Sequence, residues 1–236
     1  MAMRRGRSEL WNLSSILALA ALGCVLLYGL RVVISGRIWY LYLVLNLAIA
    51  FVPYIIAAAG TVLLAATPSK RLRAFIVAPV ALLWLLFYPN APYILTDFIH
   101  VVERTYLKAP PSDSLGLNAI LWYDLIMNAA FAFMGHFIGL VSMWLMQRNL
   151  KSSWGRTAAI ATILAAALLA GFGIYLGRFL RLNSWDLLLD PRRVIAEIGE
   201  AVQDPLVFLF SAVFSLFIFL TYAALVMFKR MSPSED

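Results

Sequence analysis

One short stretch contains most of the side chains that could bind a ligand or transfer a proton. It runs from Phe87 to His100 and reads FYPNAPYILTDFIH. On a helix that restarts after Asn90, its polar residues would share one face, because they follow one another at steps of three and four residues. These residues are Asn90, Tyr93, Asp97, His100 and Arg104. A carboxylate and an imidazole on one face could form an acid–base pair, so the stretch predicts a site of binding or catalysis.

A second carboxylate comes from the sequence WYD, which ends at Asp124. If the helix that carries Asp124 lies beside the first stretch, then Asp97, His100 and Asp124 could together hold a divalent metal ion. The sequence contains no second histidine near this set and no HExxH-type pattern. A metal site is therefore one hypothesis among several, and the sequence identifies no cofactor.

A third motif, GFGIYLGRFLRLNSWD, adds two arginines and two further polar candidates, Asn183 and Asp186. Arg178 and Arg181 are predicted to share a helix face, where they could hold a phosphate, a phospholipid or another lipid-linked head group.

The alternative is that these cations only neutralise carboxylates, because an unpaired charge is costly in an apolar setting. In that reading Arg178 pairs with Asp124, and Arg181 pairs with Asp97 or Asp186. Both readings remain open from the sequence.

The elements that position these groups must be membrane helices. The chain has 236 residues, of which 63% are hydrophobic and 13% charged, and its mean hydropathy is +0.87. Such a chain is too apolar for a soluble domain and too long for one span. We predict an all-α, single transmembrane domain over residues 1–236, a bundle of six helices with one extracytoplasmic interfacial helix. The predicted spans are 11–34, 38–66, 72–88, 118–147, 157–180 and 206–228.

The prolines at 89 and 92 predict a break near Phe87 in the third span, with the turn in the outer interfacial region. In the fourth span, polar and small residues recur at steps of three and four, which predicts close packing against another helix. They are Asp124, Asn128, Ala132, Gly135, Gly139 and Ser142. Gly173 and Gly177 in the fifth span are likewise predicted to serve helix packing.

His136 lies near the middle of the fourth span, where an ionisable residue is a functional candidate. The alternative is a hydrogen bond between its imidazole and a neighbouring helix.

Asp190-Pro191 predicts the start of an amphipathic interfacial helix. Its apolar side, made of Val194, Ile195, Ile198 and Val202, should lie against the bilayer surface or the bundle.

The basic residues predict the orientation in the membrane. Of the 19 Lys and Arg residues, 11 lie at the two termini and the second and fourth connections, and 8 lie in the other connections. Because Lys and Arg favour the cytoplasmic side, both termini are predicted to be cytoplasmic. The polar ends of the third, fourth and fifth helices would then form an outward-facing cleft, covered by the interfacial helix. The net charge of +7 belongs to these membrane flanks and does not indicate nucleic-acid binding.

The three motifs together resemble an uncharacterised family of bacterial multi-pass membrane proteins, over about residues 72–186. The resemblance implies location in a bacterial inner membrane and supplies no activity or catalytic residue.

Three functions fit the sequence: binding or transport of a small or lipid-linked anion, an enzyme acting on a lipid head group at the extracytoplasmic face, and a structural or assembly role. The lipid bilayer is the one certain partner, and protein partners are not identifiable.

Overall fold

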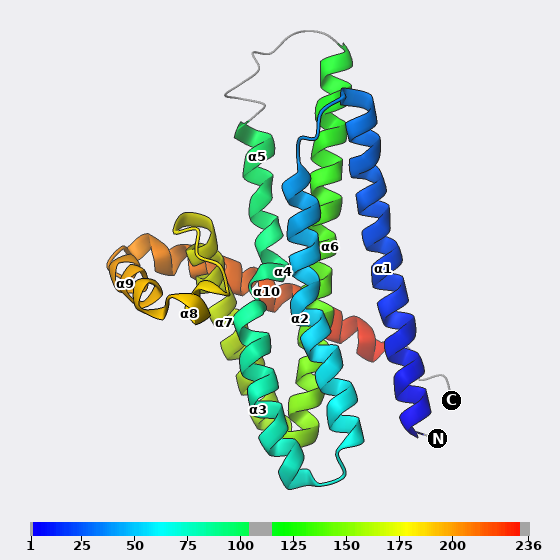
Figure 1. Ribbon diagram of the computed structural model, residues 1–236, viewed down its shortest axis with the longest axis vertical. Coiled ribbons are helices and arrows are strands. Elements are labelled where there is room, and N and C mark those ends of the chain that lie inside the picture. The colour runs from blue at the N-terminus through cyan, green and yellow to red at the C-terminus, as the bar shows by residue number, and fades with distance from the viewer. Residues whose placement is uncertain (1, 104–114, 232–236) are drawn as a thin grey trace.

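The computed structural model describes residues 2–103 and 115–231, and these residues form helices and short connections, with no strand among them (Figure 1). Six helical runs are long and apolar enough to cross a membrane, which confirms the predicted polytopic helical bundle. The elements are α1 (Ala2–Ser35), α2 (Leu41–Ala66), α3 (Lys70–Phe87), α4 (Asn90–Tyr93), the 3-10 helix η1 (Ile94–Asp97), α5 (Phe98–Glu103), α6 (Leu115–Trp154), α7 (Arg156–Phe179), α8 (Asp186–Leu189), α9 (Pro191–Ala201) and α10 (Pro205–Met231).

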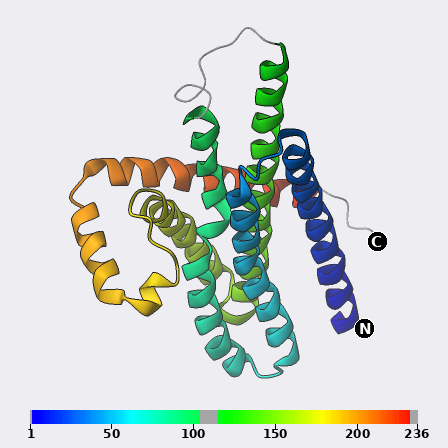
Figure 2. The same ribbon diagram turned by 45° about the horizontal axis from the view of Figure 1, so that its top comes forward.

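α6 is the central helix of the bundle. Over Ala119–Trp154 it is more deeply buried than any other described span. α1, α2 and α3 stand beside it, while α7 and α10 pack against each other on another side. Figures 1 and 2 show α10 running across the long helices rather than parallel to them.

The small residues of α6 pack against the broken third span, as the stripe predicts. A Cβ atom on Gly135 would come within 2.6 Å of Ile94, and one on Gly139 within 2.9 Å of Ala91. One turn further on, the Trp84 indole donates a hydrogen bond to the Ser142 hydroxyl (2.6 Å). Close approach of these helices therefore requires the glycines.

The third apolar run continues past the proline break, near which the sequence predicts its end. α3 ends at Phe87 as expected, but the chain continues through α4, η1 and α5, so the apolar run extends over Lys70–Val101. Tyr88 keeps helical dihedral angles (φ −57°, ψ −41°) despite preceding Pro89. The break packs against Gly139, near the middle of α6, and the apolar run continues past it to Val101. Tertiary packing here overrides the local preference of a residue before proline.

Asn90 does not cap the restarted helix. α4 begins at Asn90 itself, and no side-chain hydrogen bond caps it. The Asn90 amide instead reaches the segment between α7 and α8, where it donates to the Ser184 hydroxyl (3.1 Å). Arg104, predicted to continue this polar face, lies outside the described residues.

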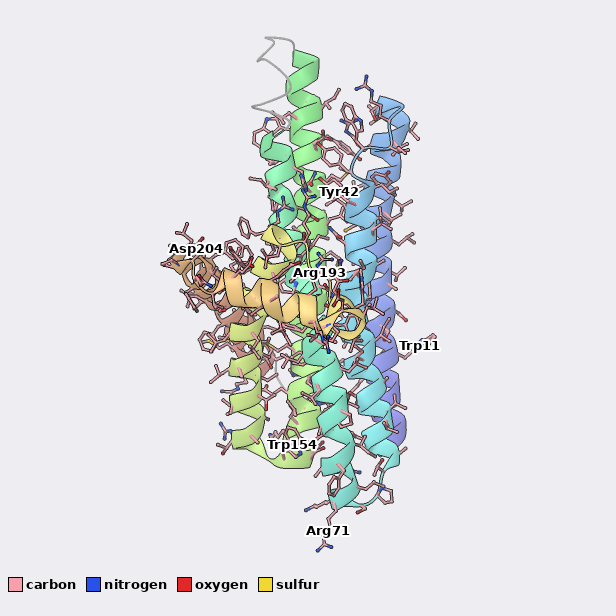
Figure 3. All side chains as sticks on the ribbon, turned by 60° about the vertical axis from the view of Figure 1, so that its left-hand side comes forward. Trp11, Tyr42, Arg71, Trp154, Arg193 and Asp204 are labelled. Atoms are coloured by element: carbon pink, nitrogen blue, oxygen red, sulfur yellow. The ribbon has the colours of Figure 1, made fainter. Side chains whose placement is uncertain are left out.

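α9 starts as predicted, with Pro191 in its first turn and the Asp190 side chain accepting a hydrogen bond from the Arg193 backbone N–H (3.3 Å). On the exposed side of α9, Arg193 donates a hydrogen bond to Glu197, and this bond raises the pKa of Arg193. The predicted apolar side of α9 is only partly buried. Val194 is buried, whereas Ile195 is 65% exposed. Figure 3 shows α9, which carries Arg193, running across the long helices on one side of the bundle.

Candidate functional site

A cavity of about 520 Å³ lies between α2, the broken third span, α7 and the segment that holds α8 and α9. Its position follows from the break, because Pro89 and Tyr93 turn toward α7 where Gly173 and Gly177 leave room for them. A Cβ on Gly173 would come within 2.7 Å of Pro89, and one on Gly177 within 3.1 Å of Tyr93. The glycines of α7 therefore serve helix packing, as predicted, and help to shape the cavity wall.

The wall changes from apolar to polar along the bundle. At one end it is formed by Leu85, Leu86, Leu169 and Phe172. α3 to α5 and α7 all run from this apolar end toward the end at which α2 begins. At the second end the lining side chains are Tyr42, Asn46, Asp97, His100 and Arg178. The cavity is therefore amphipathic along its length.

Asp97 is the centre of the polar end. Its carboxylate is buried, and it accepts a hydrogen bond from the Asn46 amide (2.7 Å). Nη1 of Arg178 lies 3.8 Å from the other carboxylate oxygen. The same nitrogen donates to Nε2 of His100 (3.4 Å). At 3.8 Å the contact between Arg178 and Asp97 is an ion pair but too long for a hydrogen bond. The guanidinium has further N–H donors, and the Arg178 side chain is partly exposed at the cavity wall.

The middle of the cavity is closed by the loop after α7. The Ser184 hydroxyl donates to the backbone carbonyl of Leu86 (2.8 Å) and accepts from the Asn90 amide. Asn183 and Trp185 line the cavity from the same loop, and Val194 and Ile198 line it from α9. A loop and an amphipathic helix thus cover the break in the third span.

Six of the nine candidate residues from the sequence line this cavity, and three do not. The six are Asn90, Tyr93, Asp97, His100, Arg178 and Asn183. Asp124, Arg181 and Asp186 are absent from its wall. The prediction that the third, fourth and fifth helices form the cleft is wrong in one member: α2 lines the cavity, and none of the described lining residues belongs to α6.

Asp124 pairs with Arg31 and not with Arg178. Nε and Nη2 of Arg31 each donate to one carboxylate oxygen of Asp124, the second at 3.0 Å. The Tyr40 hydroxyl adds a third hydrogen bond at 2.9 Å. All three side chains are buried, so this group is a closed ion pair between α1 and α6.

Arg181 does not share a helix face with Arg178, because α7 ends at Phe179 and Arg181 has a left-handed backbone (φ 57°). The N–H of Leu182 bonds back to the carbonyl of Leu176 (3.2 Å), which makes Arg181 the left-handed residue of a helix-ending turn. Its side chain is exposed and pairs with neither Asp97 nor Asp186. Asp186 instead accepts the backbone N–H of Asn183 (2.6 Å).

The three proposed metal ligands are not gathered into one site. Asp124 is held by Arg31, and the part of the chain that the structure describes contains no group of three or more His, Cys, Asp or Glu residues able to hold one ion. His136 also lies elsewhere. Nε2 of His136 and the Thr221 hydroxyl lie 2.9 Å apart and form a hydrogen bond between α6 and α10, which was the alternative prediction.

Sequence reasoning missed Asn46 and Ser184. Asn46 is a lone amide inside the second apolar span, and a polar residue at that depth is expected to have a partner. That signal could have found it. Ser184 carries no comparable signal, because a serine in a loop after a helix is common.

The family model described as a protein of unknown function, DUF1361, matches residues 45–222. The chain belongs to this family. No curated protein and no solved structure matches the chain. The DUF1361 region includes every lining residue of the cavity except Tyr42, and it includes Asp124 but neither Arg31 nor Tyr40.

Proposed function

We propose that this membrane protein binds an anionic amphiphile in the cavity between α2, the third span and α7. The anionic head group contacts Arg178 at the polar end, and the hydrocarbon chain lies against the apolar wall formed by Leu85, Leu169 and Phe172. A phosphate-bearing lipid or a lipid-linked sugar phosphate has this chemistry. The proposal places the polar end at the extracytoplasmic face of a bacterial inner membrane.

The observation that carries the proposal is the change from apolar to polar lining along one cavity of about 520 Å³. A small inorganic anion would use only the polar end and would leave a hydrocarbon-lined space beside it. An amphiphile fills both, because each part of the molecule meets a surface of its own polarity. The cavity volume lies within the range of ordinary small-molecule sites, about 300–1,000 Å³.

The polar end offers both donors and acceptors to a head group. Arg178 is only loosely held by Asp97 at 3.8 Å, and a guanidinium presents several N–H groups in the geometry that suits phosphate. The Asp97 carboxylate can accept from a hydroxyl. This combination favours a head group with a phosphate and at least one hydroxyl, such as a glycerol or sugar phosphate.

A catalytic role is a second candidate function, because Asp97 and His100 line the same cavity as Arg178. In that case they would act as acid and base on a head group held by Arg178. Incubation with phosphatidylglycerol vesicles separates the two functions, since an enzyme releases a product that mass spectrometry detects. Asp97→Asn and His100→Gln would abolish that product.

Ligand-dependent thermal unfolding in phosphatidylcholine nanodiscs tests the binding proposal. Dodecyl phosphate should stabilise the wild-type protein by about 2.7 kcal/mol at 100 times its Kd. Arg178→Gln should lose this stabilisation. Arg181→Gln is the matched control, because it removes the same charge three residues away without touching the cavity.

Two results would contradict the proposal. One is equal stabilisation by dodecyl phosphate in the wild-type protein and in Arg178→Gln. The other is full stabilisation by inorganic phosphate, which would show that the apolar wall contributes nothing. Absence of any ligand effect would favour the structural or assembly role.

Alkaline phosphatase fusions test the orientation. Fusions after Glu200 and after Lys108, which lies outside the described residues, should be active, because the enzyme folds outside the cytoplasm. A fusion after Lys151 should be inactive. The reverse pattern would place the polar end of the cavity in the cytoplasm.

A further inference from the structure

A second cavity, of about 600 Å³, lies at the opposite end of the bundle. Its walls come from the start of α1, the end of α2 and the ends of α6 and α10, with Arg73 from the start of α3. The first cavity is lined by the start of α2 and the end of α7. The two cavities therefore occupy opposite ends of α2. Figure 3 shows Arg71 and Trp154 at the end that holds the second cavity and Tyr42 toward the other end.

Two cations share one aromatic ring in this cavity. The guanidinium of Arg148 lies 4.8 Å from the ring centroid of Trp144, and Nζ of Lys229 lies 3.5 Å from the same centroid. Trp144 and Arg148 belong to α6, and Lys229 belongs to α10. Neither cation forms a salt bridge with another described residue, so two like charges contact the same indole ring.

The other charged groups leave this cavity positive. Arg73 also lines it, and its Nε donates to the Thr67 carbonyl (2.5 Å), which leaves its charge without an acidic partner among the described residues. Glu9 is the single acidic residue of the described lining. Three cations against one carboxylate attract an anion, which would also relieve the repulsion between Arg148 and Lys229.

Beside the cations the wall is apolar and partly open. Val62 is 40% exposed and Phe137 is 44% exposed, while Val141 and Leu145 are buried behind them. These side chains belong to membrane-spanning segments, so their exposed surfaces face hydrocarbon. A lipid chain can lie along this wall while its head group stays beside Arg148 and Lys229.

We infer that the second cavity is a binding site for an anionic phospholipid of the leaflet at this end of the bundle. Its phosphodiester lies between Arg148 and Lys229, and one acyl chain lies along Phe137 and Val62. Basic pockets between transmembrane helices have the chemistry that recognises such head groups. The inference uses no residue of the first cavity and does not depend on the function proposed for it.

Native mass spectrometry of the protein with phosphatidylglycerol and phosphatidylcholine tests this site. The wild-type protein should retain phosphatidylglycerol preferentially. Arg148→Gln with Lys229→Gln should lower that retention about 25-fold, since each basic residue near an anionic lipid contributes about fivefold. The control, Lys151→Gln with Arg156→Gln, removes the same charge from exposed positions at the same end, outside the described lining, and should retain the lipid.

A measurement on the unmodified protein keeps the inference testable if the double variant does not fold. Phosphatidylglycerol with a photoreactive head group should label the segments around Trp144 and Lys229. Labelling elsewhere, equal loss in the two double variants, or complete displacement by millimolar inorganic phosphate would each overturn the inference. Variant Arg178→Gln should leave this labelling unchanged, which separates failure here from failure of the proposed function.

Discussion

Within residues 2–103 and 115–231, two pairs of an aspartate and an arginine are chemically alike and structurally different. Arg31 and Asp124 make two N–H to oxygen contacts, and the Tyr40 hydroxyl completes the set. Their side chains are only 6% and 10% exposed. Arg178 and Asp97 meet at 3.8 Å, with the arginine partly exposed to the cavity.

The difference separates charges that maintain the fold from charges that are available to a ligand. The Asp124 carboxylate already accepts hydrogen bonds from Arg31 and Tyr40. Asp124 lines none of the described cavities. Asp97 and Arg178 have unused capacity at a cavity wall. A buried ion pair is costly to break, because removal of one partner leaves the other charge uncompensated. Asp97 is itself buried, but the Arg178 side chain is 20% exposed at the cavity wall, so loss of Asp97 would not leave a fully buried cation.

The largest expected effect is that of Asp124→Asn. It should destabilise the protein by about 3–5 kcal/mol, because Arg31 would remain buried without a counterion. Thermal unfolding in detergent measures the loss. The double variant Asp124→Asn with Arg31→Gln should be more stable than the sum of the single losses predicts.

An exposed ion pair is the control for this result. Glu197→Gln breaks the i,i+4 pair with Arg193 on α9 and should leave stability nearly unchanged. If Asp124→Asn is no worse than Glu197→Gln, the contrast between the closed pair and an ordinary surface pair fails.

Tyr40→Phe should have the next largest effect. It removes one hydrogen bond to a buried carboxylate and keeps the ring, so we expect a loss of about 1.5–3 kcal/mol. Tyr28→Phe is the matched control, because the Tyr28 hydroxyl donates to the Ile38 carbonyl at an exposed position (3.3 Å). Chemical denaturation measures the free energy of unfolding of both variants. Equal losses would show that the buried Tyr40 hydroxyl stabilises the fold no more than an exposed tyrosine hydroxyl does.

Asp97→Asn should cost about 1 kcal/mol, the scale of one hydrogen bond, because Arg178 is 20% exposed at the cavity wall and keeps its contact with His100. Asp97→Asn should also alter the stabilisation of the protein by dodecyl phosphate. The folded fraction of Asp124→Asn should keep the stabilisation of the wild-type protein. A loss of stability as large as that of Asp124→Asn would mean that both pairs serve the fold.

The smallest effect is expected from Arg181→Gly. Glycine adopts the left-handed conformation at this position without the cost of a Cβ atom, so stability should rise by about 0.5–1 kcal/mol. Ligand binding should be unchanged. Loss of binding in this variant would return Arg181 to the candidate site, from which its backbone conformation removes it.

The sequence predicts the fold well because the fold depends on patterns that span many residues. Six apolar runs mark six helices, and the glycine stripe of α6 indicates the contact with the third span. The continuation of the third run past the proline break could not be predicted, since it depends on the packing of Ala91 and Ile94 against α6.

The partners of charged residues were harder to predict than the residues themselves. The sequence indicates Asp124 as a candidate, but its partner Arg31 enters only as one of the 19 basic residues that predict the orientation. The partner is 93 residues away in sequence, and no local pattern connects the two. The prediction for Arg181 is wrong for a different reason. α7 ends at Phe179, two residues before Arg181, so Arg181 is not on the helix face that the periodicity predicts.

The hydrogen bonds of Ser184 couple two features that are distant in sequence. Leu86 lies in the last turn of α3, where backbone carbonyls lack partners within the helix, and its carbonyl accepts the Ser184 hydroxyl. The broken helix therefore supplies the attachment point for the loop that leads to α8 and α9. Folding of that loop is thermodynamically linked to the break: a third span made continuous would lose its bend and also the order of the segment that covers the cavity.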